Sequence, residues 1–354
     1  MKVLPLGKVP WSILTDLVCK TGFINRGIIQ NAEQGVDVAV LDLQEVIEHV
    51  NKIYQTHSIP FFVYKADPIT FPTPNPSKYL IIINRNDLAT AGAIPYGITA
   101  TILLPHSTTK NRLIEIQNNL SQVCEEHKIT ILGGHTEVTE NVQYPILSGN
   151  MIGFVPPEYY IPRNPQVGDH IICSGWVGAE GTGILLAEAE NYFSKSLNKH
   201  EYLQGIQIGK EIDIFTRTIE CNLKFHDSLT LVHDCTEGGI FGALYECLAP
   251  KNLGCNVTMS KIPLSPVTKK VTEMLKLNPY KLISSGAVLL VCDNTMSQII
   301  RDFLRSFDLP AEIIGEVTEK GNPIHVNNVK VGPPESDHII LGLDNLKKSK
   351  NRLH

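Results

Sequence analysis

Strand-like and helical patterns alternate through the first half of the chain, and this alternation limits its fold more than any other feature. Residues 98–104 are apolar and β-branched, as in a buried strand, and residues 111–127 space their apolar side chains as a helix does. A second apolar run, residues 129–132, is expected to be a strand that ends at Gly133 and Gly134. The alternation predicts a layered α/β domain, in which helices cover a sheet.

The length of the chain and a proline-rich segment predict a second domain. The chain has 354 residues, which is more than one hydrophobic core usually holds together. Prolines are densest in residues 156–168, a composition typical of a domain boundary. We therefore expect an N-terminal domain over residues 1–155 and a C-terminal domain over residues 156–354. The second should contain strands over residues 170–174, 230–232, 288–292 and 313–317 and helices over residues 181–192, 238–248 and 296–306.

Further elements are expected in the first domain. Residues 12–22 are typical of a short amphipathic helix, and residues 36–42 alternate acidic and apolar side chains like a half-buried strand. Residues 61–68 form another strand candidate that runs into a turn. Residues 79–83 fit a short strand or a helix, and a new helix of small residues is expected to start at Asp87.

Composition excludes several classes of protein. The net charge of −5 and the sequence pI near 6.2 give no broad positive field, so we expect no nucleic-acid partner. The basic residues 347–352 are expected to form a solvated tail. No apolar stretch is long enough for a secretory signal or a membrane span, so we expect a cytoplasmic protein. The eight cysteines contain no CxxC pair and are expected to be reduced thiols in the core.

Four aspartates lie at the end of, or within, strand-like runs beside small or turn-forming residues: Asp37, Asp67, Asp87 and Asp234. Magnesium prefers hard oxygen ligands and usually shares its shell between a few carboxylates, waters and substrate phosphates. Carboxylates on separate strand ends suit that need. Each aspartate taken alone also fits a turn or cap residue, and Asp87 in particular fits a helix N-cap.

A glycine pair followed by three functional side chains is a candidate phosphate and catalytic segment. In the run from Gly133 to Glu137, the backbone N–H groups of Gly133 and Gly134 and the Thr136 hydroxyl can hold phosphate oxygens. His135 fits a general acid or base or a substrate contact, and equally a hydrogen-bonded structural histidine.

A glycine-rich segment over residues 175–183 is a second candidate. It leads into a helix whose N-terminus can bind an anion, and it equally fits a tight strand-to-helix turn. It lacks the spacings of the Walker A and Rossmann motifs. Further along, Cys235 lies beside Asp234, and because a neighbouring carboxylate raises the pKa of a thiol, we interpret this cysteine as structural.

Taken in order, eight motifs resemble the PurM-like superfamily. This superfamily includes aminoimidazole ribonucleotide synthetase, the synthetase domains of formylglycinamidine synthase, selenophosphate synthetase, thiamin-monophosphate kinase and the hydrogenase-maturation dehydratase HypE. The order of the motifs is more specific than any one of them. They lie in residues 35–39, 67–70, 86–95, 133–137, 178–182, 233–239, 285–286 and 314–317.

The resemblance implies an α/β (α+β) fold of two domains. The N-terminal domain would form a β-barrel across a homodimer, and the C-terminal domain would be an α/β layered domain. ATP and Mg²⁺ would bind between the domains. Carried over by motif, the metal ligands would be Asp37, Asp67, Asp87 and Asp234, the catalytic residues His135 and Glu137, and the cofactor-binding residues Asn86, Gly133, Gly134, Thr136, Gly178, Gly181 and Thr182.

Three functions follow from the resemblance. The first is an ATP- and magnesium-dependent synthetase or kinase that phosphorylates an oxygen, in an amide carbonyl or a small-molecule substrate. The second is a HypE-like maturation factor that acts on an amide of a partner protein, and the third is a non-catalytic, nucleotide-binding dimeric scaffold. The HypE branch ends in a cysteine where this chain reads Lys350 to His354, which argues against the dehydratase reaction. Residues 21–34 lack the glycine-rich pattern of several branches, so closure over phosphate is expected to differ.

Overall fold

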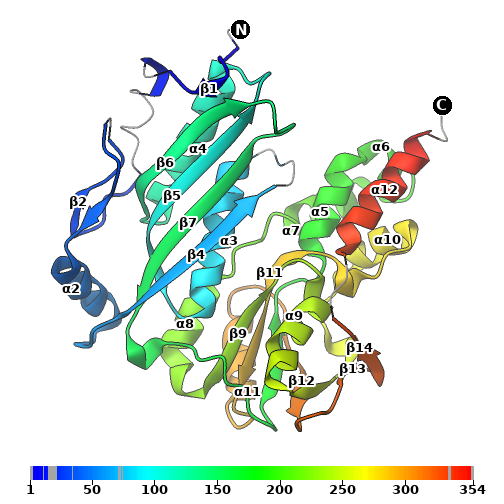
Figure 1. Ribbon diagram of the computed structural model, residues 1–354. Helices are drawn as coiled ribbons and strands as arrows, with labels where there is room; N and C mark the ends of the chain where they lie inside the picture. The colour runs from blue at the N-terminus through cyan, green and yellow to red at the C-terminus, as the bar shows by residue number, and fades with distance from the viewer. Residues whose placement is uncertain are drawn as a thin grey trace. The chain divides into compact units, whose positions relative to one another are not determined.

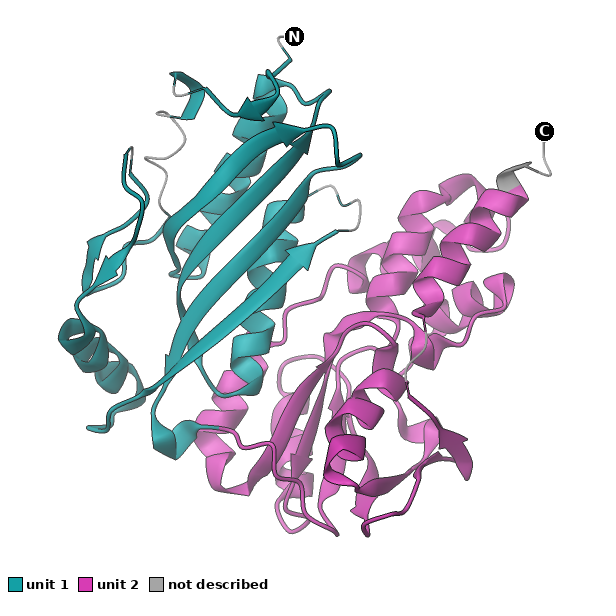
Figure 2. Cartoon of the chain, viewed as in Figure 1, with its two compact units in different colours: residues 1–160 teal, residues 161–354 magenta. Residues whose placement is uncertain are grey.

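The chain separates into two compact units, residues 1–160 and residues 161–354, which Figure 2 shows in two colours. The computed structural model describes residues 3–10, 12–14, 22–33, 35–70, 73, 75–333 and 336–351. The helix expected over residues 12–22 lies largely outside the described residues. The expected domain boundary after residue 155 falls near the end of the first unit.

The first unit is built on a five-stranded sheet with the order β1-β6-β5-β7-β4. Strands β5 and β6 are parallel, and the other neighbours are antiparallel. Helices α3 and α4 lie together on one side of this sheet (Figure 1). The bounds are β1 Gly7–Lys8, β4 Phe61–Ile69, α3 Pro76–Thr90, β5 Ile94–Pro105, α4 Lys110–Glu126, β6 Thr130–Thr139 and β7 Ile146–Val155.

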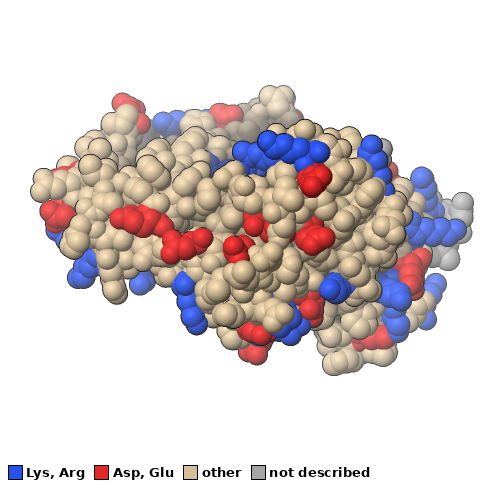
Figure 3. Space-filling view, turned by 90° about the horizontal axis from the view of Figure 1, so that it is seen from below, with Lys and Arg blue, Asp and Glu red and all other residues tan. Residues whose placement is uncertain are grey.

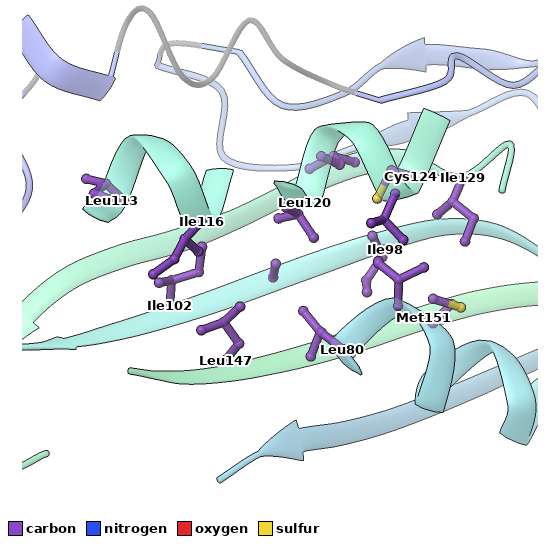
Figure 4. Close-up of a cluster of buried hydrophobic side chains, with 14 of the residues drawn as sticks. Leu80, Ile98, Ile102, Leu113, Ile116, Leu120, Cys124, Ile129, Leu147 and Met151 are labelled. Atoms are coloured by element: carbon purple, nitrogen blue, oxygen red, sulfur yellow. The ribbon is translucent and has the colours of Figure 1, made fainter. Parts of the chain in front are cut away.

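The core of this unit lies between the two helices and the sheet. Helix α4 buries apolar side chains at helical spacing, as the sequence predicts, and each fully buried Leu or Ile contributes about 1.5–3 kcal/mol of transfer free energy. Every second residue of β5 and β7 points to the same core, because side chains alternate along a strand. Figure 4 shows these contacts among Leu80, Ile98, Ile102, Leu113, Ile116, Leu120, Leu147 and Met151.

The other face of the sheet is covered at one end by helix α2, Leu43–Tyr54. Its buried face packs against Tyr96 and Phe154. The prediction of a strand over residues 36–42 is wrong for most of its length, because only β3, Val40–Leu41, pairs with β2, Ile28–Gln30. Asp42 instead caps α2, and its Oδ1 accepts a hydrogen bond from the Gln44 backbone N–H at 3.0 Å.

The second unit contains a seven-stranded sheet with the order β14-β13-β10-β12-β8-β11-β9. Its strands are β8 His170–Ser174, β9 Leu229–Cys235, β10 Gly254–Val257, β11 Ser284–Cys292, β12 Ala311–Thr318, β13 Ile324–Val326 and β14 Val329–Val331. Strands β10 and β13 are parallel, and the other neighbours are antiparallel. The strands predicted over residues 170–174, 230–232, 288–292 and 313–317 are confirmed.

Helices cover both faces of this second sheet. Ile171 packs with helix α9 and its neighbour Ile172 with helices α8 and α11, so the two helix groups lie on opposite faces. A separate helical cluster packs around Leu185 and Leu282. The predicted helix over residues 181–192 is interrupted at Ala189, which separates α5 from α6. The helices are α5 Ala179–Glu188, α6 Glu190–Phe193, α7 Lys199–Ile208, α8 Phe215–Phe225, α9 Gly239–Leu248, α10 Pro266–Leu275, α11 Ser297–Arg305 and α12 His338–Asn351.

Strand β6 does not end at the glycine pair, as the sequence led us to expect, but continues to Thr139. The register shifts here: Ile98 of β5 pairs with Ile131, whereas Thr99 pairs with Gly133. One extra residue of β6 is therefore accommodated in a β-bulge. A Cβ atom at Gly134 would lie 2.0 Å from the carbonyl oxygen of Ala100, so the bulge requires glycine there.

This close approach predicts different effects for the two glycines. Gly134→Ala should lower the free energy of unfolding by about 3 kcal/mol, because its methyl group would displace the β5 backbone. Gly133→Ala is the matched control. Its Cβ would meet nothing nearer than the Thr99 methyl group at 4.0 Å, so the change should stay within about 0.5 kcal/mol. Urea unfolding of both variants measures the difference, and equal losses would contradict the bulge geometry.

Candidate functional site

The structure brings two of the four predicted metal-ligating aspartates together around a lysine. Lys65 and Asp67 are two residues apart on β4 and therefore point to the same face of the sheet, toward α3. Asp87 comes from the last turn of α3. The Lys65 Nζ lies 3.1 Å from Asp87 Oδ2 and 3.7 Å from Asp67 Oδ2. All three side chains are partly exposed, with Asp87 the most enclosed at 19%.

Helix α3 begins earlier than the sequence led us to expect, and this changes the interpretation of Asp87. The helix starts at Pro76, and the Asn75 side chain caps it by accepting a hydrogen bond from the Lys78 backbone N–H at 3.0 Å. Asp87 is therefore not an N-cap. It lies at the C-terminal end, where unpaired carbonyls already carry partial negative charge and a carboxylate is unfavourable. The capping explanation is excluded, and the Lys65 ammonium offsets the charge.

One asparagine side chain of α3, Asn84, contacts the same corner. The Asn84 amide nitrogen donates to the carbonyl oxygens of Leu80 at 2.8 Å and Asp67 at 3.4 Å. Its Oδ1 is buried and accepts no hydrogen bond. Asn86, predicted to bind the cofactor, is fully buried within α3. The Asn84 amide therefore lies beside the backbone of Asp67.

The chemistry of this corner fits a magnesium ion whose coordination shell is completed from outside the chain. Two carboxylates supply hard oxygen ligands, and phosphates and waters usually supply the rest. Within the part of the chain that the structure describes, no three His, Cys, Asp or Glu side chains are grouped closely enough to hold a metal by themselves. A metal here would therefore depend on its substrate phosphates.

The other two predicted metal ligands belong to other elements of the chain. Asp37 is exposed in the connection between β2 and β3. Asp234 belongs to the second unit, where it is buried near the end of β9 with its Oδ1 3.7 Å from the Nδ1 of His233. Within the first unit, the structure groups Asp67 with Asp87.

The segment after the glycine pair divides between the two faces of the sheet. His135 Nε2 lies 3.0 Å from Glu137 Oε2, and both side chains are well exposed on the face away from α3 and α4. Thr136 points the opposite way, where it is buried and its hydroxyl accepts a hydrogen bond from Gln117 of α4 at 3.5 Å. The expected grouping of Thr136 with Glu137 does not form, because adjacent side chains of a strand alternate between faces.

The two candidate segments of this unit are also separated across the sheet. Asp67 pairs with Gly149, Gly149 with Ala100, and Ala100 with Gly134. Three strand spacings, roughly 14 Å, therefore lie between Asp67 and Gly134. Within one chain, the glycine pair and the aspartate pair are different sites.

In the second unit, the predicted anion-binding residues at the start of α5 are engaged with the protein itself. The Gly178 N–H donates to the Ser284 hydroxyl at 2.6 Å, and the Gly181 N–H donates to the Ile283 carbonyl oxygen at 3.2 Å. The Thr182 hydroxyl donates to the Gly178 carbonyl oxygen at 2.7 Å. These contacts are those of a tight strand-to-helix turn, the alternative that the sequence left open.

Buried carboxyl groups near this turn were not singled out from the sequence. Glu180 accepts a hydrogen bond from the Ser285 N–H at 2.9 Å, and burial raises the pKa of its carboxyl group. Asp337 accepts from the N–H groups of Gly238 and Ile339 at 2.8 and 2.7 Å, and burial raises its pKa also. Asp337 directly precedes α12, a position typical of an N-cap, so a search for helix starts would have found it.

The seven cysteines within the described residues are buried and form no disulfide. Burial raises the pKa of the Cys235 thiol well above its usual value, and Cys173 and Asp234 add to the effect. The structural interpretation of this cysteine therefore rests mainly on burial.

The surface and the helices give two further observations. On the face shown in Figure 3, acidic and basic side chains are interspersed and form no continuous basic field. Among the described residues, no helix combines the length and the apolar character needed to cross a bilayer.

Two family models match the chain. The N-terminal domain of AIR synthase related proteins matches residues 68–155, and the C-terminal domain of the same proteins matches residues 166–326. Asp87 and Gly134 lie in the first match, and Gly178 and Asp234 lie in the second.

Curated relatives cover most of the chain. A protein of Methanocaldococcus jannaschii described as a hydrogenase expression/formation protein is 25% identical over 330 residues, which is 91% of this chain and 92% of the relative. The carbamoyl dehydratase HypE of Escherichia coli is 24% identical over 290 residues, which is 80% of this chain and 81% of the relative.

Solved structures share the fold. Escherichia coli HypE, a hydrogenase maturation protein, matches with a TM-score of 0.76 and 19% identity over 92% of this chain and 97% of that chain. A HypE in complex with ATP matches with a TM-score of 0.66 and 18% identity over 86% and 90%. A thiamine-monophosphate kinase from Stenotrophomonas maltophilia matches with a TM-score of 0.66 and 19% identity over 86% and 92%. The predicted two-domain α/β fold is confirmed.

The buried Glu180 predicts a pH-dependent loss of stability. Because the folded-state pKa of this carboxyl group is raised above its ordinary value of 4.5, its contribution to stability is complete below that value and is lost as the pH rises through the folded-state pKa. Glu180→Gln keeps an acceptor for the Ser285 N–H and cannot ionise. The variant should therefore gain stability over the wild type as the pH rises from about 4 to about 7. Urea unfolding at both pH values measures this gain, and a pH-independent difference would contradict it.

Proposed function

Because the chain belongs to the AIR synthase-related protein family, we propose that it is an ATP-dependent enzyme of the HypE-like branch. It phosphorylates the carbonyl oxygen of an amide-type group that a partner protein carries. The relatives support this function through the names carbamoyl dehydratase and hydrogenase expression/formation protein. The described cysteines are buried, so among them none presents a thiol that could carry the substrate group.

One observation carries the proposal: the convergence of Asp67 and Asp87 at the edge of the first unit. An aspartate in the last turn of a helix opposes the helix dipole, which favours a cation beside it, and both carboxylate side chains are partly exposed. We assign Mg²⁺ to these two side chains. Bound there, Mg²⁺ would neutralise phosphate oxygens of ATP.

The proposed chemistry uses ATP to remove water from the amide. The amide oxygen attacks the γ-phosphorus, the bond from that phosphorus to the β–γ bridging oxygen breaks, and ADP leaves. The C–O bond then breaks with loss of phosphate, while the amide nitrogen gives up its two protons and a nitrile forms. Phosphate thus carries away the amide oxygen. His135 and Glu137 of the same chain lie on the opposite face of the sheet from Asp67 and Asp87, so the two protons are proposed to pass to water.

We also propose that the enzyme works as a homodimer that covers the open face of the first sheet. This face carries His135 and Glu137, together with Phe62 and Tyr64, which are 59% and 57% exposed. Exposed aromatic side chains in one patch are typical of an interaction surface. The dimer would place His135 and Glu137 in an enclosed setting.

A kinase reaction on a small molecule is the second candidate, because a thiamine-monophosphate kinase shares the fold. An ¹⁸O label distinguishes the dehydration from the kinase reaction. With ¹⁸O in the amide carbonyl, dehydration should release inorganic phosphate that contains ¹⁸O, detected by the isotope shift in ³¹P NMR. Phosphate without the label, or a stable phosphorylated product, would contradict dehydration and favour the kinase.

A variant of the aspartate pair tests the nucleotide site itself. Asp87→Asn should lower magnesium-dependent ATP hydrolysis about 100-fold or more, because it removes one of the two charges assigned to the metal. Asp227→Asn is the matched control, since its side chain is 94% exposed in the second unit. Steady-state ADP release measures both. Wild-type protein that binds ATP with magnesium and never hydrolyses it would instead support the non-catalytic scaffold.

A further inference from the structure

We propose that Lys65 is a built-in counter-ion that holds the Asp67–Asp87 pair in place of a divalent cation and has to leave when one binds. The lysine thereby sets how strongly this site takes a metal before nucleotide arrives. The identity of the metal as magnesium rests on the proposed function, whereas the competition between ammonium and metal does not.

The position of Lys65 follows from the strand. Alternation along β4 aims Lys65 and Asp67 at α3, and their pairing partners Met151 and Gly149 lie on the same core-facing side of β7. The absence of a side chain at Gly149 leaves room for the Asn84 amide, because a Cβ atom at residue 149 would lie 3.1 Å from the Asn84 amide nitrogen. The lysine side chain is 36% exposed, so its ammonium has an open side through which it can withdraw.

The charges around Lys65 need a cation. Asp67 and Asp87 both place an oxygen within 4 Å of the same nitrogen. The Asn84 amide contacts the Asp67 carbonyl oxygen at 3.4 Å, and its own Oδ1 is buried without a hydrogen bond. Asp87 also faces the negative end of its own helix. The Lys65 ammonium brings one positive charge to these two carboxylates, whereas a divalent cation would bring two.

The Lys65 ammonium and a metal ion cannot both occupy the position beside the two carboxylates. Magnesium takes carboxylate oxygens at about 2.0–2.1 Å, and the Lys65 Nζ already lies 3.1 and 3.7 Å from the oxygens concerned. A metal that draws the two carboxylates together must therefore displace the lysine. The freed ammonium, a compact charge on a flexible stem, is then available to the phosphate oxygens that arrive with the metal.

Manganese binding to the nucleotide-free protein tests this competition, because Mn²⁺ resembles Mg²⁺ in ligand preference and is read out by electron paramagnetic resonance. Lys65→Met keeps most of the length of the side chain and removes its charge. It should bind Mn²⁺ at least about tenfold more tightly than the wild type. Lys320→Met, in a turn of the second unit, is the matched control and should bind like the wild type.

Stability provides a second readout. Without metal, Lys65→Met should unfold at a lower urea concentration than the wild type, and Mn²⁺ should restore its midpoint while shifting the wild type less. If Lys65→Met does not fold, Lys65→Gln takes its place in both experiments. Manganese affinity that is equal to or weaker than that of the wild type would overturn the inference.

The failure of this inference can be distinguished from failure of the proposed function. If Lys65→Met tightens manganese binding while the wild type hydrolyses no ATP, the counter-ion role stands and the enzymatic function falls. If the wild type hydrolyses ATP with magnesium while manganese affinity is unchanged in Lys65→Met, the counter-ion role alone falls.

Discussion

The packing of helix α3 against strands β4 and β7 is the constraint on which the candidate site depends. This helix is buried along almost its whole length, and even its polar residues Asn84, Arg85 and Asn86 are enclosed. A helix held on so many sides has little freedom to rotate or slide. Its last turn is therefore fixed relative to β4, and Asp87 is delivered to Lys65 and Asp67 by packing and not by a flexible loop.

Carboxylates in the two units have different partners. The kind of partner distinguishes a carboxylate with a structural role from one whose partner a cation can replace. Glu180 and Asp337 accept hydrogen bonds from backbone N–H groups, which no ligand can displace without opening the fold. Asp67 and Asp87 instead face a lysine side chain that is partly exposed. A side-chain ammonium can withdraw by a change of rotamer without opening the fold, so this pair is the better place for a reversible cation.

How much of the fold the sequence predicts depends on how each element is buried. Helix α4 was predicted nearly to its ends because its apolar residues recur at helical spacing. Strand β8 was predicted because its short apolar run is bounded by Gly168 and Gly175. The bounds of helix α3 were not predicted, because its consecutive residues Leu80 to Ile83 are all buried and give no amphipathic pattern. Strand β6 was cut short because glycine serves a bulge and a turn equally well, and only the register with β5 tells them apart.

The candidate site, too, could be predicted from the sequence only in part. The ordered motifs identified the family, but the grouping of side chains depends on which face of a strand each occupies. Once β6 is known to continue, period-two alternation places His135 and Glu137 together and Thr136 opposite. Alternation along β4 places Lys65 beside Asp67 in the same way, so that half of the cluster was present in the sequence. The contact of Lys65 with Asp87 could not be predicted, because it requires the end of α3 to pack across β4. No local sequence pattern encodes the distance between these two elements.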